Sequence, residues 1–83
     1  MKPAPFTYYS DPGHGWIFVD FATLSEVGLT RDSFSSCSFT KAGGMLLEED
    51  CDAGVFIRAY KTYHGAEPEL RERLLNDRSE IGI

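Results

Sequence analysis

Four carboxylates lie close together in the middle of the chain, within the segment LEEDCD; they are Glu48, Glu49, Asp50 and Asp52. A cluster of oxygen ligands could hold a divalent cation, but this spacing does not match that of a calcium-binding loop. The same carboxylates could cap a helix and form a solvated acidic surface, or they could bind a basic partner. Their position before a helix favours capping and surface exposure over a partner-binding patch, and both over a metal site.

His14 is the second candidate for chemistry, in the turn Asp11-Pro12-Gly13-His14-Gly15. An exposed imidazole beside Asp11 could act as an acid or base near neutral pH. The turn is also explained without chemistry, because Pro12 fixes φ, Asp11 can bond its own backbone and glycine accepts positive φ. We therefore predict a structural turn, with Gly13 or Gly15 at positive φ, ahead of a chemical role for His14.

The two cysteines, Cys37 and Cys51, belong to no C-x-x-C or H-x-x-x-H pattern that would indicate zinc. In a reducing compartment we expect free thiols, with a buried thiol favoured over a disulfide. A helix start would lower the pKa of Cys51, but the neighbouring carboxylates would raise it again. The residues therefore predict no catalytic site, no metal site and no cofactor.

Composition limits the class of protein. The 83 residues suit one small domain, residues 1–83, and an apolar content of 42% is that of a folded chain. A net charge of −5 argues against direct nucleic-acid binding and favours a basic partner. There is no apolar run long enough for a membrane span, and the N-terminus lacks the apolar region of a signal peptide. We expect a cytoplasmic protein that is a monomer or a homodimer.

A helix should follow the carboxylates. Its apolar stripe consists of Ala53, Phe56, Ile57, Tyr60 and either Tyr63 or His64, at helical spacing. These residues predict an amphipathic helix near 51–64. Asp50 or Asp52 would be its N-cap, His64 would suit the dipole at its C-terminus, and Gly65 would end it.

Two hairpins should supply most of a sheet. Residues 6–10 and 16–20 form the first around the SDPGHG turn, and 37–40 and 45–49 form the second. Between them, Asp20 should cap a short helix near 21–27 that ends at Gly28, with Leu29 packing on Leu24. Residues 67–76 suit either a short helix or a charged edge strand, with propensity slightly favouring helix.

The predicted fold is therefore of the α+β class. It is a single small domain in which an antiparallel sheet carries two helices on one face, in the order ββαββαβ. We expect Phe56, Ile57 and Tyr60 to be buried from the long helix. Trp16 and Phe18 should be buried from the sheet.

Three segments together resemble a known family: YSDPGHGW at 9–16, LEEDCD at 47–52, and a tail with Arg71, Glu72, Asn76 and Ser79. They are similar to small proteins and domains of phages, prophages and other mobile elements, largely of unknown function. In that family the tail is extended and carries histidines near positions 74 and 75. This chain has Leu74 and Leu75 there, which removes support for a histidine-based catalytic site. The resemblance also favours a strand in the tail.

A small acidic protein of this origin without a catalytic constellation resembles the anti-CRISPR inhibitors, many of which bind a Cas protein or a type I surveillance complex. We therefore expect a non-enzymatic, phage-derived inhibitor in the host cytoplasm that blocks DNA engagement. Its predicted partner-binding residues are Glu48, Glu49, Asp50, Asp52, Glu67 and Glu69. The alternatives are an adaptor unrelated to CRISPR and, with less support, a metal-assisted hydrolase or nuclease.

Overall fold

A computed structural model describes residues 5–82 of the chain. The regular elements are β1 (Phe6–Ser10), β2 (Gly15–Asp20), α1 (Phe21–Glu26), β3 (Phe39–Lys41), β4 (Gly44–Glu48), α2 (Ala53–His64) and β5 (Leu70–Leu74). Two 3-10 turns, η1 (Arg31–Ser33) and η2 (Arg78–Ile81), complete the chain. The α+β class and the order ββαββαβ are confirmed, and the tail forms a strand.

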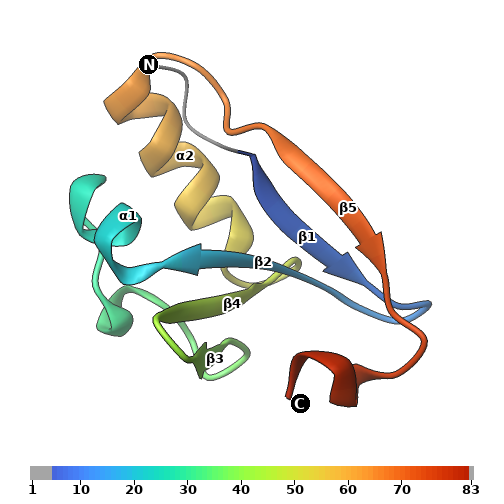
Figure 1. The fold of residues 1–83 in the computed structure, drawn as a ribbon. Coiled ribbons are helices and arrows are strands. Elements are labelled where there is room, and N and C mark those ends of the chain that lie inside the picture. Colours follow the sequence, from blue (N-terminus) through green and yellow to red (C-terminus); the bar gives the residue numbers. More distant parts are fainter. Residues whose placement is uncertain (1–4, 83) are drawn as a thin grey trace.

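The five strands form one sheet in the order β3-β4-β2-β1-β5 (Figure 1). β2 is antiparallel to both β1 and β4, and β3 is antiparallel to β4, as predicted. β5 is parallel to β1, so the prediction of an antiparallel sheet is wrong at this edge. The reason is the crossover through α2, which returns the chain to the end of the sheet where β1 begins, as parallel pairing requires.

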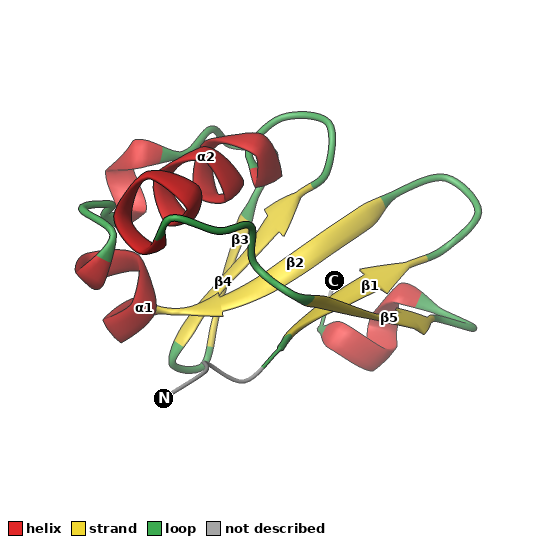
Figure 2. Ribbon diagram, turned by 90° about the horizontal axis from the view of Figure 1, so that it is seen from above, coloured by secondary structure: helices red, strands yellow, loops and turns green. Residues whose placement is uncertain are grey.

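One face of the sheet carries both helices, as Figure 2 shows. Ile17, Val19, Met45 and Leu47 point from the sheet into a core that also contains Leu24, Ala53, Phe56 and Tyr60. Phe6 packs edge-on against Phe56 and Tyr60, with ring centroids 5.2 and 5.6 Å apart. The predicted burial of Phe56 and Tyr60 is confirmed. Ile57 is only half-buried, because it lies at the margin of the helical stripe.

The opposite face holds a second, smaller cluster. Trp16 and Leu46 lie on the alternate positions of β2 and β4, and Leu75 and Ile81 from the C-terminal segment cover them. Trp16 is buried as predicted, whereas Phe18 is half-buried beside this cluster. The η2 turn that supplies Ile81 was not predicted, and it lies on the side of the sheet away from the helices.

The helix ends follow local sequence signals closely. Asp20 accepts a hydrogen bond from the Thr23 N–H at 2.6 Å, so the predicted N-cap of α1 is confirmed. Gly28 has φ 83°, and the Leu29 N–H donates to the Leu24 carbonyl at 2.8 Å. Gly65 ends α2 with φ 76°, also as predicted.

The SDPGHG turn differs from prediction in one respect. The Asp11 side chain accepts from the backbone N–H groups of Gly13 and His14 at 2.9 and 2.8 Å, as expected for this turn. Neither Gly13 nor Gly15 has a positive φ, so that prediction is wrong. Gly15 instead leaves room for its neighbours, because a Cβ there would overlap the Tyr8 hydroxyl and the Glu49 carboxylate, and both side chains would have to shift.

Within residues 5–82, no helix is long and apolar enough to cross a membrane.

Candidate functional site

The four carboxylates of LEEDCD do not share one environment. Glu48 and Asp52 are buried, with 7% and 3% of their surfaces exposed, whereas Glu49 and Asp50 are exposed. Surface exposure was therefore predicted correctly for two of the four. The two buried carboxylates are held by hydrogen bonds inside the molecule.

Asp52 anchors the segment before β3. Its carboxylate accepts from the Ser35 N–H at 3.1 Å, from the Ser35 hydroxyl at 2.9 Å and from the Ser38 hydroxyl. Asp52 is the N-cap residue of α2, as one of the two predicted alternatives, but its side chain makes no capping hydrogen bond, so the predicted capping contact is wrong. Burial acts to raise the pKa of Asp52, but the hydrogen bonds from Ser38 and Ser35 outweigh it and lower the pKa.

Glu48 closes the turn between β4 and α2. Its Oε2 accepts from the backbone N–H groups of Asp50 and Cys51 at 2.8 and 2.9 Å. Its Oε1 lies 3.5 Å from Nδ1 of His14. Burial acts to raise the pKa of Glu48, but hydrogen bonds from Cys51, Asp50 and His14 together lower it.

The exposed carboxylates are spread over the molecule. Glu49 accepts a hydrogen bond from the Tyr8 hydroxyl. Burial and this bond to Glu49 raise the pKa of Tyr8 to about 12. Glu67 and Glu69 are exposed, but they follow the C-terminus of α2, whereas Asp50 precedes its N-terminus. A helix of 12 residues is roughly 18 Å long, so the six predicted carboxylates do not form one patch.

His14 lies at a pocket of about 360 Å³ on the sheet face opposite the helices. We call this the dithiol pocket; its lining residues are His14, Trp16, Cys37, Phe39, Glu48, Asp50, Cys51 and Arg78. The His14 ring stacks on Trp16 with centroids 5.8 Å apart. The SDPGHGW segment, the LEEDCD segment and the tail, which are distant in the sequence, meet here.

Arg78 brings the tail to this pocket. Its guanidinium lies 5.3 Å from the centroid of the Trp16 ring, and its Nε donates to Asp11 Oδ2 at 2.7 Å. The hydrogen bond from Arg78 lowers the pKa of Asp11 to about 2. The sequence reasoning did not identify Arg78 or Phe39 as site residues. The DRSE capping box in the tail is the signal that would have placed Arg78 on an ordered turn.

The two thiols are neighbours. Cys51 donates a hydrogen bond to Cys37, with the two Sγ atoms 2.7 Å apart. Both cysteines are exposed and free, so the predicted buried thiol is wrong. The hydrogen bond to Cys37, partial desolvation of the sulfur by its neighbours and the Glu48 carboxylate raise the pKa of Cys51 to about 12. This thiol is protonated at neutral pH and is therefore a weak nucleophile.

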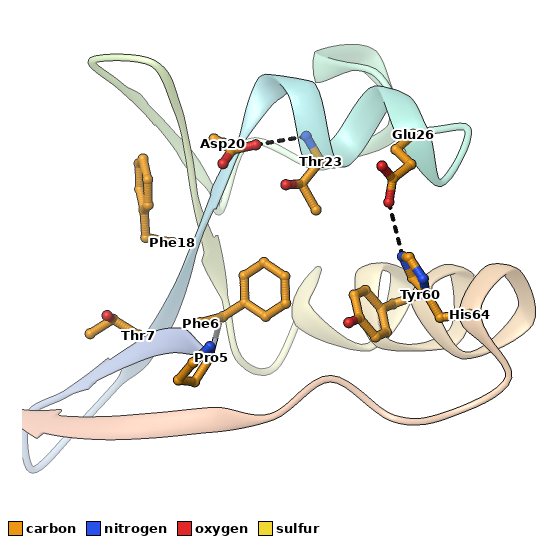
Figure 3. Close-up of a pocket in the computed structure, with 9 residues that line it drawn as sticks. All are labelled: Pro5, Phe6, Thr7, Phe18, Asp20, Thr23, Glu26, Tyr60 and His64. Atoms are coloured by element: carbon orange, nitrogen blue, oxygen red, sulfur yellow. Dashed lines mark hydrogen bonds and ion pairs between the residues drawn. The ribbon is translucent and has the colours of Figure 1, made fainter. Parts of the chain in front are cut away.

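A second pocket, of about 390 Å³, opens between the two helices and the first hairpin (Figure 3). His64 lies on its wall, with Nε2 3.0 Å from Glu26 Oε1 and its ring 4.3 Å from that of Tyr60. The predicted placement of His64 at the helix C-terminus is confirmed, and its partner across the pocket is a residue of α1. This pair links the two helices.

In the described part of the chain, no three His, Cys, Asp or Glu side chains are grouped so that they could hold a metal ion. Comparisons with protein-family profiles, curated proteins and solved structures found no match to this chain. The resemblance to mobile-element proteins therefore remains a prediction from sequence. The dithiol pocket is the candidate site because it brings together side chains from the SDPGHGW turn, the LEEDCD segment and the C-terminal tail, which are distant in the sequence.

Proposed function

We propose that this chain is a non-enzymatic binding protein that holds a basic side chain of a partner protein in the dithiol pocket. The observation that carries the proposal is the pocket lining. Phe39 offers a ring that is 42% exposed, and Asp50 offers an exposed carboxylate at the same opening. An aromatic face beside a carboxylate attracts a lysine or arginine side chain through cation–π and ionic contacts.

The local charge also suits a basic group. Arg78 is already paired with Asp11, and the exposed Asp50 supplies negative charge at the opening, while the buried Glu48 carboxylate also lines the pocket. The net charge of −5 would add long-range attraction to a basic partner. The pocket would then anchor the basic side chain of the bound partner, and the exposed carboxylates would mainly increase the association rate.

More specifically, we propose that the partner is a Cas protein or a type I surveillance complex. The resemblance to mobile-element proteins and the net charge of −5 support this partner. The lysines and arginines that hold nucleic-acid phosphates would be occupied by this chain, so that DNA could not engage. A protein unrelated to CRISPR is the alternative partner.

A binding experiment with matched charge changes tests the proposal. Purified type I complexes are titrated with the wild-type chain and with Asp50→Lys, Phe39→Ala and Glu67→Lys. Asp50→Lys and Phe39→Ala should each weaken binding by at least about tenfold. Glu67→Lys makes the same charge change at the opposite end of α2 and should weaken binding by less than about threefold.

Equal losses for Asp50→Lys and Glu67→Lys would show that only net charge matters, and the pocket would be abandoned as the anchor. A plaque assay on hosts with active type I systems tests the proposed partner. If expression of the chain restores phage growth in none of them, the anti-CRISPR function is rejected. Capture from a host lysate would then identify the partner on which the pocket variants are tested.

A further inference from the structure

Cys37 and Cys51 are brought together by the hydrogen bonds on either side of them. Ser35 and Ser38 flank Cys37, and both donate to the carboxylate of Asp52, the residue after Cys51. Ser38 Oγ also accepts from the Glu48 N–H at 3.0 Å, and Ser35 Oγ accepts from the Cys37 N–H at 3.2 Å. These hydrogen bonds therefore hold the two cysteine-bearing segments together without any bond between the sulfur atoms.

The sulfur atoms need little movement to bond. Their separation of 2.7 Å is within an ångström of a disulfide bond length of about 2.05 Å. Both residues are exposed, and both line the dithiol pocket, so a small solute can reach them. A pair that is both close and accessible is suited to reversible oxidation.

We propose that Cys37 and Cys51 form a reversible redox site that reacts with a low-molecular-weight disulfide such as glutathione disulfide. In the first step the Cys37 thiolate attacks one sulfur of glutathione disulfide, which breaks that disulfide, forms a mixed disulfide at Cys37 and releases one glutathione thiolate. In the second step Cys51 loses its proton and attacks the Cys37 sulfur, and the second glutathione leaves. Two protein thiols are oxidised, and one glutathione disulfide is reduced to two glutathiones that carry the two protons.

The order of attack follows from the position of the Glu48 carboxylate. Its Oε2 accepts from the Cys51 N–H at 2.9 Å, and a negative charge at this distance disfavours a thiolate at Cys51, so the first attack is assigned to Cys37. Cys51 is the resolving thiol, consistent with a pKa of about 12 beside Cys37 and Glu48. Once Cys37 is in the mixed disulfide, Cys51 is already adjacent to it.

Oxidation would change one wall of the dithiol pocket. The bond would add a covalent link between the segment before β3 and the turn before α2, which the hydrogen bonds from Ser35 and Ser38 to Asp52 already join. Exposed disulfides are reduced readily, so the change would reverse as the thiol pool becomes more reducing. This inference does not depend on the proposed binding function.

The test uses the full chain in glutathione redox buffers, with alkylation of free thiols and intact mass measurement. The wild type should lose both alkylatable thiols as a monomer, its mass falling by two hydrogens, and should recover both in excess reduced glutathione. Cys51→Ser should accumulate one glutathione at Cys37. Cys37→Ser should be modified more slowly, because the Glu48 carboxylate beside Cys51 still opposes ionisation of its thiol. Circular dichroism checks that each variant is folded.

Two results would overturn the proposal. One is a wild type that keeps two free thiols in a buffer in which Cys51→Ser is glutathionylated. The other is a wild type whose oxidation yields disulfide-linked dimers instead of an internal bond. Faster modification of Cys37→Ser than of Cys51→Ser would reverse the assigned order of attack and overturn that part of the mechanism.

Discussion

At the scale of single residues, Asp52 has the most instructive environment. A carboxylate at a helix start is expected to cap the helix, but this one binds Ser35 and Ser38. The partners of Asp52 are 14 to 17 positions away in the sequence, and nothing in the local pattern identifies them. By contrast, Asp20 caps α1 through a residue three positions away, and that contact was predictable.

The Asp52 contacts predict a specific pH dependence. The folded-state pKa of Asp52 is lowered, so its contribution to stability is present above the unfolded pKa and is lost as pH falls through the folded pKa. Asp52→Asn removes the charge and should destabilise the chain by about 1–3 kcal/mol at pH 7. The difference from wild type should shrink as pH falls below the ordinary aspartate pKa of about 3.9 and should vanish only once the pH is below the lowered pKa of the folded state.

Urea unfolding of both proteins across this pH range measures the effect. Asp50→Asn is the matched control, since the Asp50 side chain is exposed, and it should change stability by less than about 0.5 kcal/mol. A difference for Asp52→Asn that stays constant with pH would contradict the assigned role of the charge.

At the scale of elements, periodicity predicted the helices better than the sheet. The stripe on α2 is set by residues three and four apart, so Phe56 and Tyr60 were assigned to the core correctly. The direction of β5 depends on where α2 delivers the chain, which is a property of the whole fold. The alternating residues of this segment allowed a strand without deciding against a helix, and its parallel pairing with β1 was not predictable from them.

Phe56 is the strongest test of the core. It is fully buried against the sheet face that carries the helices, and Phe56→Ala should cost about 3–5 kcal/mol, enough to unfold most of a small domain. Tyr63→Ala on the same helix is the control, because Tyr63 is 60% exposed, and it should change stability by less than about 0.5 kcal/mol. Thermal unfolding by circular dichroism compares them, and a near-wild-type Tm for Phe56→Ala would refute this core.

The η2 turn gives a second element-scale prediction. Ile81 is 4% exposed and covers Trp16, the single tryptophan of the chain. Ile81→Ala should admit water to this cluster, shift Trp16 fluorescence to longer wavelength and destabilise the chain by about 2–4 kcal/mol. Leu74→Ala is the control, since Leu74 is 76% exposed on β5. An unchanged emission maximum in Ile81→Ala would show that η2 does not shield the indole.

At the scale of the whole molecule, the two faces of the sheet carry different features. One face carries both helices and most of the core, and the η2 turn lies on the other face (Figure 2). The dithiol pocket is on this second face, and Arg78 of η2 is one of its lining residues. The sequence identified many of the residues that meet at this pocket but assigned them to separate roles. Their convergence depends on the pairing of β2 with β4, which places Trp16 opposite Glu48, and local patterns do not specify that register.

The excess of acidic residues predicts how binding should respond to salt. Attraction between a chain of net charge −5 and a basic partner acts before contact, so it changes mainly the association rate. For a partner identified by the binding experiment, raising salt from about 50 mM to about 500 mM should slow association by at least about tenfold and change dissociation by less than about threefold.

Phe39 should behave in the opposite way, because its exposed ring lines the pocket and forms contacts only after docking. Phe39→Ala should accelerate dissociation by at least about tenfold and leave the salt dependence of association unchanged. Stopped-flow or surface-binding kinetics resolve the two rates. If Phe39→Ala instead reduces the salt dependence and leaves dissociation as it is, the ring does not anchor the partner, and the contact surface lies elsewhere on the molecule.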